Sequence, residues 1–326
     1  MAELRRDPIS GSWVVVGLTW VKSSEVDVCP FCPGNEHLPG KSIREFRDAG
    51  GAWLVRSFPA ANPIFMIEAP SYKRAEGMYD KMGNVGAHEI VVEHRAHTKH
   101  LSDFGEDELA LVLDMYMERI LDLKKDKRFR HVQVYRNHGE LAGSYVYHPH
   151  SHVLATSIIP HGTMLELSNS QDHYLQKERC LLCDITAQEI RQNKRIVAIS
   201  ESFVAFCPFA PRFPFEVCLL PRSHSPSFEL LTEDRALKYE FIHLFLDVMR
   251  RVERARSCHT IVLHTAPNRA MEEITQEPVE VENYFHWRVE ILPRDLRSSR
   301  FKREDDFYHL SLTPEEAAQI LRSDKP

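Results

Sequence analysis

The sequence predicts an α+β fold built from two similar halves. An internal repeat carries this prediction, because two parts of the chain hold the same elements in the same order: a Cys-x-x-Cys pair, a strand ending in histidine, an amphipathic helix, a strand, and a further histidine-bearing strand. The chain of 326 residues is long enough for one large or two medium-sized domains with real cores. We therefore expect the halves to divide into residues 1–165 and 166–326.

The first half is expected to begin with a turn and an apolar strand over Leu4–Leu18. A β-rich stretch over Gly86–His97 ends in histidine. The segment Glu106–Lys125 has acids in its first turn, an apolar stripe along one side and lysines at its end, which predicts an amphipathic helix with dipole-compatible ends. A strand is expected over His131–Arg136, and it leads directly into the stretch Asn137–Pro160.

The second half repeats this order after a polar connection near residues 161–177. Its second Cys-x-x-Cys pair answers the first, and a histidine-bearing strand follows where the corresponding strand of the first half stood. The elements we expect are a strand over Phe215–His224, a helix over Thr232–Ala255, a strand over His259–His264, a strand around Asn283–Glu290 and a closing helix over Glu315–Arg322.

Three histidines spaced by two, His148, His150 and His152, lie at the centre of the stretch Asn137–Pro160. In a strand, alternate side chains share a face, so the three imidazoles point the same way. Imidazole is a poor core filler, whereas near neutral pH it serves as nucleophile, general base or metal ligand. A chance cluster among the 18 histidines of the chain is the competing interpretation.

The two Cys-x-x-Cys pairs indicate metal binding. Cys29 and Cys32 lie on a tight Pro/Gly turn, and Cys180 and Cys183 form the second pair. This spacing brings two thiolates to one tetrahedral Zn²⁺. A thioredoxin-like redox pair is the alternative, but no βαβ context surrounds the first pair.

The triad region resembles the galactose-1-phosphate uridylyltransferase branch of the histidine-triad superfamily. The residues that carry the resemblance are Asn137, the loop Ala142-Gly143-Ser144 and the run His148-Pro149-His150-Ser151. The opening LRRDPISGSWV, the stretch Ser202–Pro221 and the run PEEAA near the end resemble the same family, so the resemblance covers nearly the whole chain.

The resemblance implies two histidine-triad-like repeats, each an antiparallel sheet with a packed helix, in a homodimer. It implies a nucleotidyltransferase that moves a nucleoside monophosphate between a nucleotide sugar and a sugar 1-phosphate or phosphate. His150 would be the nucleophile and form a nucleotidyl-histidine. The residues implied in binding the phosphates and the nucleotide are Asn137, Gly143, Ser144 and Tyr145.

Alignment of the two halves matches His148 with His286 and places Arg288 and Glu290 opposite the reactive histidines. Two closed structural zinc sites of the Cys₂His₂ type are therefore predicted. Surface histidines near strand ends are the alternative for the third ligand of each site. The predicted sets are Cys29, Cys32, His97 and His148, and Cys180, Cys183, His224 and His286.

His152 stands where the transferases of this family carry glutamine. A histidine can donate a hydrogen bond to a phosphoryl group, as glutamine does, but it can also activate water. We therefore assign a catalytic role to His150 and His152 and keep a nucleotide or nucleotide-sugar hydrolase as an alternative. The segment Phe301–Ser311 replaces a Gly-rich, sugar-holding segment of the family, so a catalytically silent zinc-stabilised binding protein is the third interpretation.

The bulk properties narrow the classes of partner. A formal net charge of −6 gives no broad basic surface for polymeric nucleic acid. Asp7 and Pro8 separate the short apolar run near the N-terminus from Arg5 and Arg6, so we expect no signal peptide, and no segment has the length of a membrane span. We expect a cytoplasmic protein that acts on small phosphorylated molecules.

Overall fold

The structure is a computed structural model that describes residues 2–18, 28–144, 146–268, 280–294 and 308–323. Within these ranges the strands form a ten-stranded sheet and a four-stranded sheet. Neighbouring strands of the large sheet run antiparallel. In spatial order its strands are β10 (Ile196–Ile199), β11 (Phe203–Phe206), β12 (Val217–Pro221), β14 (Arg288–Pro293), β13 (His259–His264), β8 (His131–His138), β9 (His150–Thr156), β7 (Gly86–Val92), β4 (Trp53–Pro59) and β3 (Arg44–Arg47).

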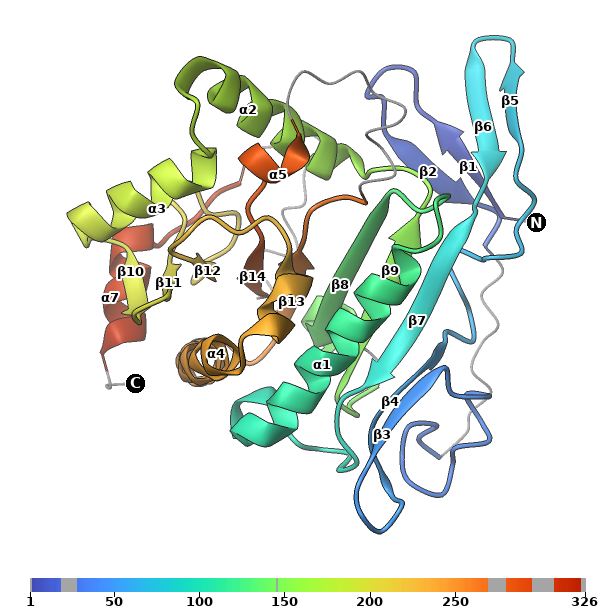
Figure 1. Cartoon of the computed structure of the whole chain (residues 1–326), viewed down its shortest axis with the longest axis horizontal. Helices are drawn as coiled ribbons and strands as arrows, with labels where there is room; N and C mark the ends of the chain where they lie inside the picture. Colours follow the sequence, from blue (N-terminus) through green and yellow to red (C-terminus); the bar gives the residue numbers. More distant parts are fainter. Residues whose placement is uncertain (1, 19–27, 145, 269–279, 295–307, 324–326) are drawn as a thin grey trace.

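The large sheet contains the predicted repeat. Five strands of the first half follow the order β8-β9-β7-β4-β3, and five strands of the second half follow the matching order β13-β14-β12-β11-β10. The halves join where β8 pairs with β13, with His138 opposite His259 and Val134 opposite Leu263. The two halves therefore share one continuous antiparallel sheet (Figure 1). The α+β fold class is confirmed.

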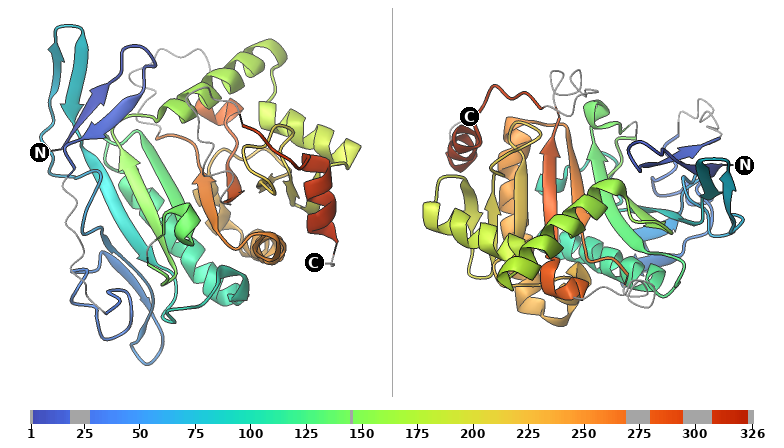
Figure 2. Two further views of the ribbon diagram at one scale, coloured as in Figure 1. Left: turned by 180° about the vertical axis from the view of Figure 1, so that it is seen from behind. Right: turned by 90° about the horizontal axis from the view of Figure 1, so that it is seen from above.

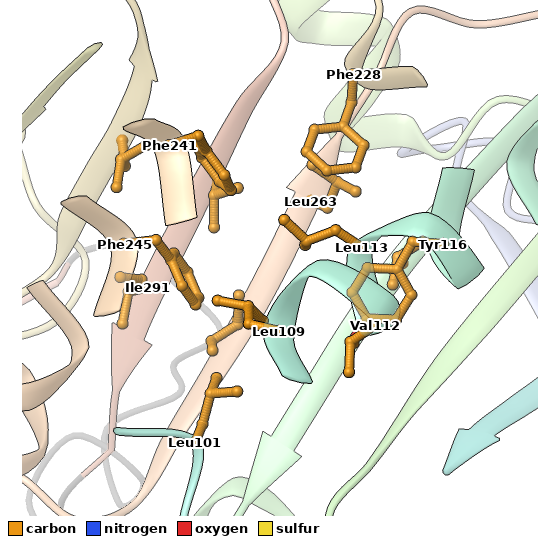
Figure 3. Packing of buried hydrophobic residues seen from close by; sticks show 14 of the residues in the cluster. Leu101, Leu109, Val112, Leu113, Tyr116, Phe228, Phe241, Phe245, Leu263 and Ile291 are labelled. Atoms are coloured by element: carbon orange, nitrogen blue, oxygen red, sulfur yellow. The ribbon is translucent and has the colours of Figure 1, made fainter. Parts of the chain in front are cut away.

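One long helix from each half covers the same face of this sheet. The predicted helices are α1 (Glu106–Leu123) and α4 (Arg235–Ala255), and Lys238 of α4 donates to Asp114 of α1 at 2.7 Å. Their apolar sides meet strand residues such as Leu263 and Ile291 in the main core (Figure 3). Helix α4 begins at Arg235 rather than at residue 232, because the side chain of Asp234 accepts a hydrogen bond from Leu237 N and caps the helix there.

The remaining α-helices lie around the second half (Figure 1), and 3₁₀ turns occur in both halves. Helix α3 packs Leu182, Ile185 and Ile190 against the sheet face opposite to α1 and α4. The elements are α2 (His161–Lys177), α3 (Leu181–Gln192), α5 (Val281–Tyr284), the closing helix α7 (Pro314–Arg322), and the 3₁₀ turns η1 (Leu101–Asp103), η2 (Glu140–Ala142) and η3 (Phe228–Glu233). Within the described ranges, no helix has the length and apolar character that crossing a membrane requires.

The segment 161–177 corrects a prediction, because it is helix α2 and not a polar connection. Its buried stripe consists of Thr163, Leu167 and Ser170, at spacings of four and three residues. Only one of these three side chains is apolar, so the stripe leaves almost no hydrophobic periodicity in the sequence. Packing of this stripe against its surroundings, rather than composition, makes the segment helical.

The chain start also differs from the prediction. Two strands lie within the region expected to hold a turn followed by one strand, because the polar run β1 (Glu3–Arg6) pairs with β2 (Trp13–Val16) on one side and with β6 (Tyr79–Gly83) on the other. Strand β5 (Lys73–Glu76) completes this small sheet. The small sheet lies at the end of the molecule away from α7 (Figure 2).

Candidate functional site

The first predicted ligand set comes together at the end of the large sheet where β9 begins. Cys29 and Cys32 lie on a turn, and the Sγ atom of Cys32 is 3.4 Å from His97 Nδ1 and 3.5 Å from His148 Nδ1. Cys29 Sγ is 3.8 Å from His148 Nδ1. The four ligand atoms all lie within 4.8 Å of one another. Residues from three separate segments of the first half thus converge on one point.

The second predicted set has the same geometry in the second half. Cys180 immediately precedes α3 and Cys183 lies in the first turn of that helix. Cys183 Sγ is 3.6 Å from His224 Nδ1 and 3.4 Å from His286 Nδ1, and Cys180 Sγ is 3.9 Å from His286 Nδ1. These four atoms also lie within 4.8 Å of one another. The repeat therefore extends from the fold to both ligand clusters.

Both clusters fit a tetrahedral zinc ion. With Zn–S near 2.3 Å and Zn–N near 2.05 Å, tetrahedral geometry separates sulfur from nitrogen by about 3.6 Å, and the observed separations run from 3.4 to 3.9 Å. Three of the histidines direct their other nitrogen to a backbone carbonyl, as ligating histidines generally do. His148 Nε2 lies 2.7 Å from His94 O, His224 Nε2 lies 2.7 Å from Glu282 O, and His286 Nε2 lies 3.1 Å from Pro221 O.

The central strand β9 carries His150 directly beyond the first cluster. His150 Nδ1 donates to the carbonyl oxygen of His148 at 2.8 Å, which leaves Nε2 with its lone pair. The residue is 8 % exposed, and the ring centroid of Phe31, from the Cys-x-x-Cys turn, lies 5.1 Å from that of His150. Burial lowers the pKa of His150 below its ordinary value, so the imidazole is neutral and nucleophilic near pH 7.

A buried charged network fixes β9 from the other face of the sheet. Ser151 and Tyr116 both donate hydroxyl hydrogens to the carboxylate of Glu93, and Arg136 Nε donates to it at 2.9 Å. Burial alone raises the pKa of Glu93, but the Arg136 charge and these hydrogen bonds outweigh it and hold the pKa below its ordinary value. An ionised carboxylate thus anchors the residue that follows His150.

His152 lies two residues further on, on the same face as His150, and the two rings are 5.3 Å apart. The Tyr135 ring of β8 stacks on it at 4.7 Å with an interplanar angle of 7°. His88 of β7 places its Nε2 atom 3.0 Å from His152 Nδ1. Sequence reasoning missed His88, because only the β7–β9 register, with His88 opposite Leu154, brings it beside His152.

The predicted phosphate-binding residues lie in or after β8. Tyr135 pairs with His152, so Asn137, two residues later, shares that face of the sheet and lies toward His150. Gly143 N donates to Glu140 O and Ser144 N donates to Gly139 O, so these amides hold the turn together. Tyr145 lies outside the described residues, as do most of the residues in Phe301–Ser311.

The corresponding strand of the second half has a different chemistry. Arg288 forms ion pairs with Glu166 of α2 and with Glu290, and Arg212 Nη2 donates to Glu290 at 2.6 Å. Burial alone raises the pKa of Glu290, but His264, Arg288 and Arg212 outweigh it and hold the pKa well below its ordinary value, so the group is ionised and paired. The second half keeps a ligand cluster and has an ion-pair network where the first half has two neutral imidazoles.

Comparison with known proteins covers nearly all of the chain. Residues 15–160 match the model of the N-terminal domain of galactose-1-phosphate uridyl transferase, and residues 166–301 match that of its C-terminal domain. A galactose-1-phosphate uridylyltransferase of Hypocrea jecorina is 31% identical over 98% of this chain and 94% of its own. An ADP-glucose phosphorylase of Arabidopsis thaliana is 25% identical over 98% of this chain and 92% of its own. A solved uridylyltransferase structure, 24% identical, shares the fold with a TM-score of 0.81 over 98% of this chain and 97% of that one.

Proposed function

Because the chain belongs to the galactose-1-phosphate uridylyltransferase family and is a nucleotidyltransferase, we propose that it works through a nucleotidyl-histidine on His150. The donor is a nucleotide sugar, and the acceptor is a sugar 1-phosphate or phosphate. The observation that carries this proposal is the hydrogen bond from His150 Nδ1 to His148 O, which leaves Nε2 as the free nucleophile. The buried, neutral state of the ring supports the same role.

The reaction divides into two displacements at the α-phosphorus. His150 Nε2 forms a bond to phosphorus while the bond to the bridging oxygen breaks, and the sugar 1-phosphate leaves with that electron pair. A phosphate oxygen of the acceptor then attacks the same phosphorus, and the P–N bond breaks. The proton stays on His150 Nδ1 and remains hydrogen-bonded to the His148 carbonyl oxygen throughout, so the carbonyl supports the positive charge that builds on the ring.

We propose that His152 and Asn137 contact the phosphoryl oxygens from the sheet face. Gly143, Ser144 and Tyr145 contact them from the loop. His152 and the side chain of Asn137 are polar groups on the same face as the nucleophile. The amides of Gly143 and Ser144 are engaged within the turn, so their part in binding requires that turn to rearrange. Loss of transfer in an Asn137→Ala variant, with the fold intact, tests the assignment.

Both acceptor types are represented among the relatives. The Arabidopsis relative is named an ADP-glucose phosphorylase and the Hypocrea relative a galactose-1-phosphate uridylyltransferase. The two names differ in base, sugar and acceptor, and this chain is 25% and 31% identical to the two proteins. We therefore include phosphate beside sugar 1-phosphates as an acceptor for this chain, and adenine beside uracil as the base.

We propose that both Cys₂His₂ clusters hold structural Zn²⁺. A closed set of four protein ligands gives zinc a scaffolding role rather than a Lewis-acid one. The first cluster includes His148, whose carbonyl accepts from the nucleophile, so its residues position His150 through the backbone. Metal analysis is expected to find two zinc ions per chain and one in Cys183→Ser. A value of two in that variant contradicts the second site.

The remaining features are part of the same proposal. We propose a cytoplasmic homodimer, as the family resemblance implies, and a division of the chain into halves 1–165 and 166–326. Sedimentation equilibrium tests the dimer, with a mass of about twice 37.8 kDa as the expected result. Limited proteolysis between the halves tests the division. Because β8 of the first half pairs with β13 of the second half, separate folding of the two fragments is a stringent form of this test.

Intact-protein mass after brief incubation with UDP-, ADP- and GDP-sugars, without acceptor, tests the central claim. The expected result is a mass gain of one nucleoside monophosphate in the wild type and in the matched control His243→Ala, whose histidine is exposed on α4, and no gain in His150→Ala. The base of the productive donor is thereby named. Free monophosphate without an adduct favours a hydrolase, and neither product with any donor favours a binding protein.

A further inference from the structure

The environment of His88 determines which of its nitrogens carries the proton. The backbone N–H of Ile64 points at His88 Nδ1 with a separation of 3.3 Å. A backbone N–H can only donate, so Nδ1 is an acceptor and holds no proton. Burial lowers the pKa of His88 to about 4, so the ring is neutral near pH 7 and its single proton lies on Nε2. Asn84 Nδ2 donates to Ile64 O at 2.9 Å and fixes the loop that supplies this N–H.

The proton on His88 in turn determines the tautomer of His152. His88 Nε2 lies 3.0 Å from His152 Nδ1, so its hydrogen is donated to that atom and His152 Nδ1 is an acceptor. Burial lowers the pKa of His152 to about 3, so this ring is also neutral and its proton lies on Nε2. The stacked Tyr135 ring restricts rotation of the imidazole out of this plane. A relay of hydrogen bonds thus runs from Ile64 through His88 to His152.

The two neighbouring histidines of β9 consequently present opposite groups at the same ring position. His150 holds its proton on Nδ1 against a carbonyl and presents a bare Nε2. His152 holds its proton on Nε2 and presents an N–H donor, because His88 occupies its other nitrogen. A side-chain amide, the group expected at this position from the family resemblance, is likewise a neutral N–H donor without a basic nitrogen.

We infer that His88 is a positioning residue that holds His152 in the Nε2–H tautomer, so that His152 donates a hydrogen bond to the transferred phosphoryl group and does not activate water. This inference rests on the proposed function for its consequence, and on the contacts of His88 together with the neutral state of the two buried rings for the tautomer. To act as a base, His152 must instead carry its proton on Nδ1 and leave Nε2 bare. His88 must then accept that hydrogen on its Nε2 and carry its own proton on Nδ1, where it faces the Ile64 N–H. Two buried donors then face each other, which makes that form about ten- to a hundredfold rarer.

The consequence is a preference for transfer over hydrolysis at a site that holds a histidine in place of an amide. A general base typically accelerates water attack by about 10²–10⁴-fold. Removal of the His88 donor frees His152 Nδ1, and the ring then populates the form whose Nε2 accepts a proton from water. This change is therefore expected to raise the ratio of hydrolysis to transfer.

The first test reads the tautomer directly in the unliganded protein and needs no activity. Ring ¹⁵N–¹H correlation spectra of histidine-labelled protein, with His152 assigned through His152→Gln, are expected to show a protonated Nε2 and an unprotonated Nδ1 in the wild type. In His88→Phe the His152 signals are expected to shift toward the Nδ1–H form. A protonated Nδ1 in the wild type overturns the inference, and so does an unchanged tautomer in His88→Phe.

The second test measures partitioning of the nucleotidyl group between water and phosphate acceptor. His88→Phe is expected to raise the hydrolysis-to-transfer ratio by about tenfold or more, whereas His88→Gln, which keeps an N–H donor, stays near wild type. In the His152→Gln background, His88→Phe is expected to leave the ratio unchanged, since no base remains. An equal rise in that background makes His88 merely structural and overturns the inference. A wild type without any nucleotidyl transfer refutes the proposed function instead, while the spectra still decide the tautomer.

Discussion

Replacement of Glu93 by glutamine is expected to cost about 3–5 kcal/mol of folding free energy, because it leaves one partner of a buried ion pair uncompensated. The Glu93 side chain is 0% exposed and that of Arg136 is 5% exposed, with Nε and Oε2 2.9 Å apart. Glutamine keeps the shape and still accepts from Tyr116 and Ser151, so the change removes chiefly the charge. The guanidinium then remains buried without its carboxylate.

Chemical and thermal denaturation measure this cost. With an entropy of unfolding of about 2.1 cal/mol/K per residue, a chain of 326 residues loses about 4–7 °C in Tm for 3–5 kcal/mol. The matched control is Glu118→Gln, which breaks an ion pair with Arg44 of similar length, 2.7 Å, at side chains that are 44% and 48% exposed. A surface pair contributes about 0–1 kcal/mol, so the control is expected to lose less than about 1.5 °C.

The pH dependence of the difference supplies a second check. Because the pKa of Glu93 in the folded protein is below its unfolded value of 4.5, its contribution is fully present above that pH and is lost as the pH falls through the folded pKa. The difference in the free energy of unfolding between wild type and Glu93→Gln is therefore constant from pH 8 to pH 5 and becomes smaller in stronger acid. Replacing both partners, as Glu93→Leu with Arg136→Met, is expected to recover much of the loss.

The reasoning is refuted if Glu93→Gln loses no more free energy than Glu118→Gln, or if the double variant is less stable than the single one. Either result means that the charge of Arg136 is compensated elsewhere. A loss of transfer activity in Glu93→Gln without loss of stability is a different outcome. It assigns the network to the placement of His150 through Ser151 rather than to folding.

Two further predictions concern acid stability and the turn before the triad. Burial lowers the pKa of His131 to about 3, whereas its unfolded value is 6.5. The contribution of His131 to stability is therefore complete above pH 6.5 and is lost as the pH falls below it, by up to about 1.4 kcal/mol per pH unit. The variant His131→Phe is expected to flatten the pH dependence of Tm between pH 6.5 and 5, and an unchanged slope contradicts this. Gly139 and Gly143 both have positive φ, 82° and 80°, but an added Cβ meets Cys258 Sγ at 2.4 Å only at Gly139. Gly143→Ala is therefore expected to cost about 1 kcal/mol in urea denaturation and Gly139→Ala at least about 2 kcal/mol, whereas equal losses refute the role of the sulfur contact.

Much of the fold was predictable because its signals are local and occur twice. Helix α1 has acids at its start and an apolar stripe along its length, and α4 repeats the stripe, so both could be found without knowledge of their partners. Helix α2 could not, since its buried stripe has a single apolar residue. Strand β1 is polar and is formed by pairing on both sides, which composition does not encode.

The sequence by itself determined which residues form the two ligand clusters, because a repeated spacing of cysteines and histidines specifies chemistry before any contact is known. The candidate nucleophile, His150, came from the family resemblance of the triad region. Only the tertiary structure decided which ring nitrogen of His150 and of His152 carries the proton. The proton on His150 depends on a carbonyl two residues away, and the proton on His152 depends on His88, which is distant in sequence and reaches it through the register of β7 against β9. Register is a property of paired strands, so no single stretch of sequence contains it.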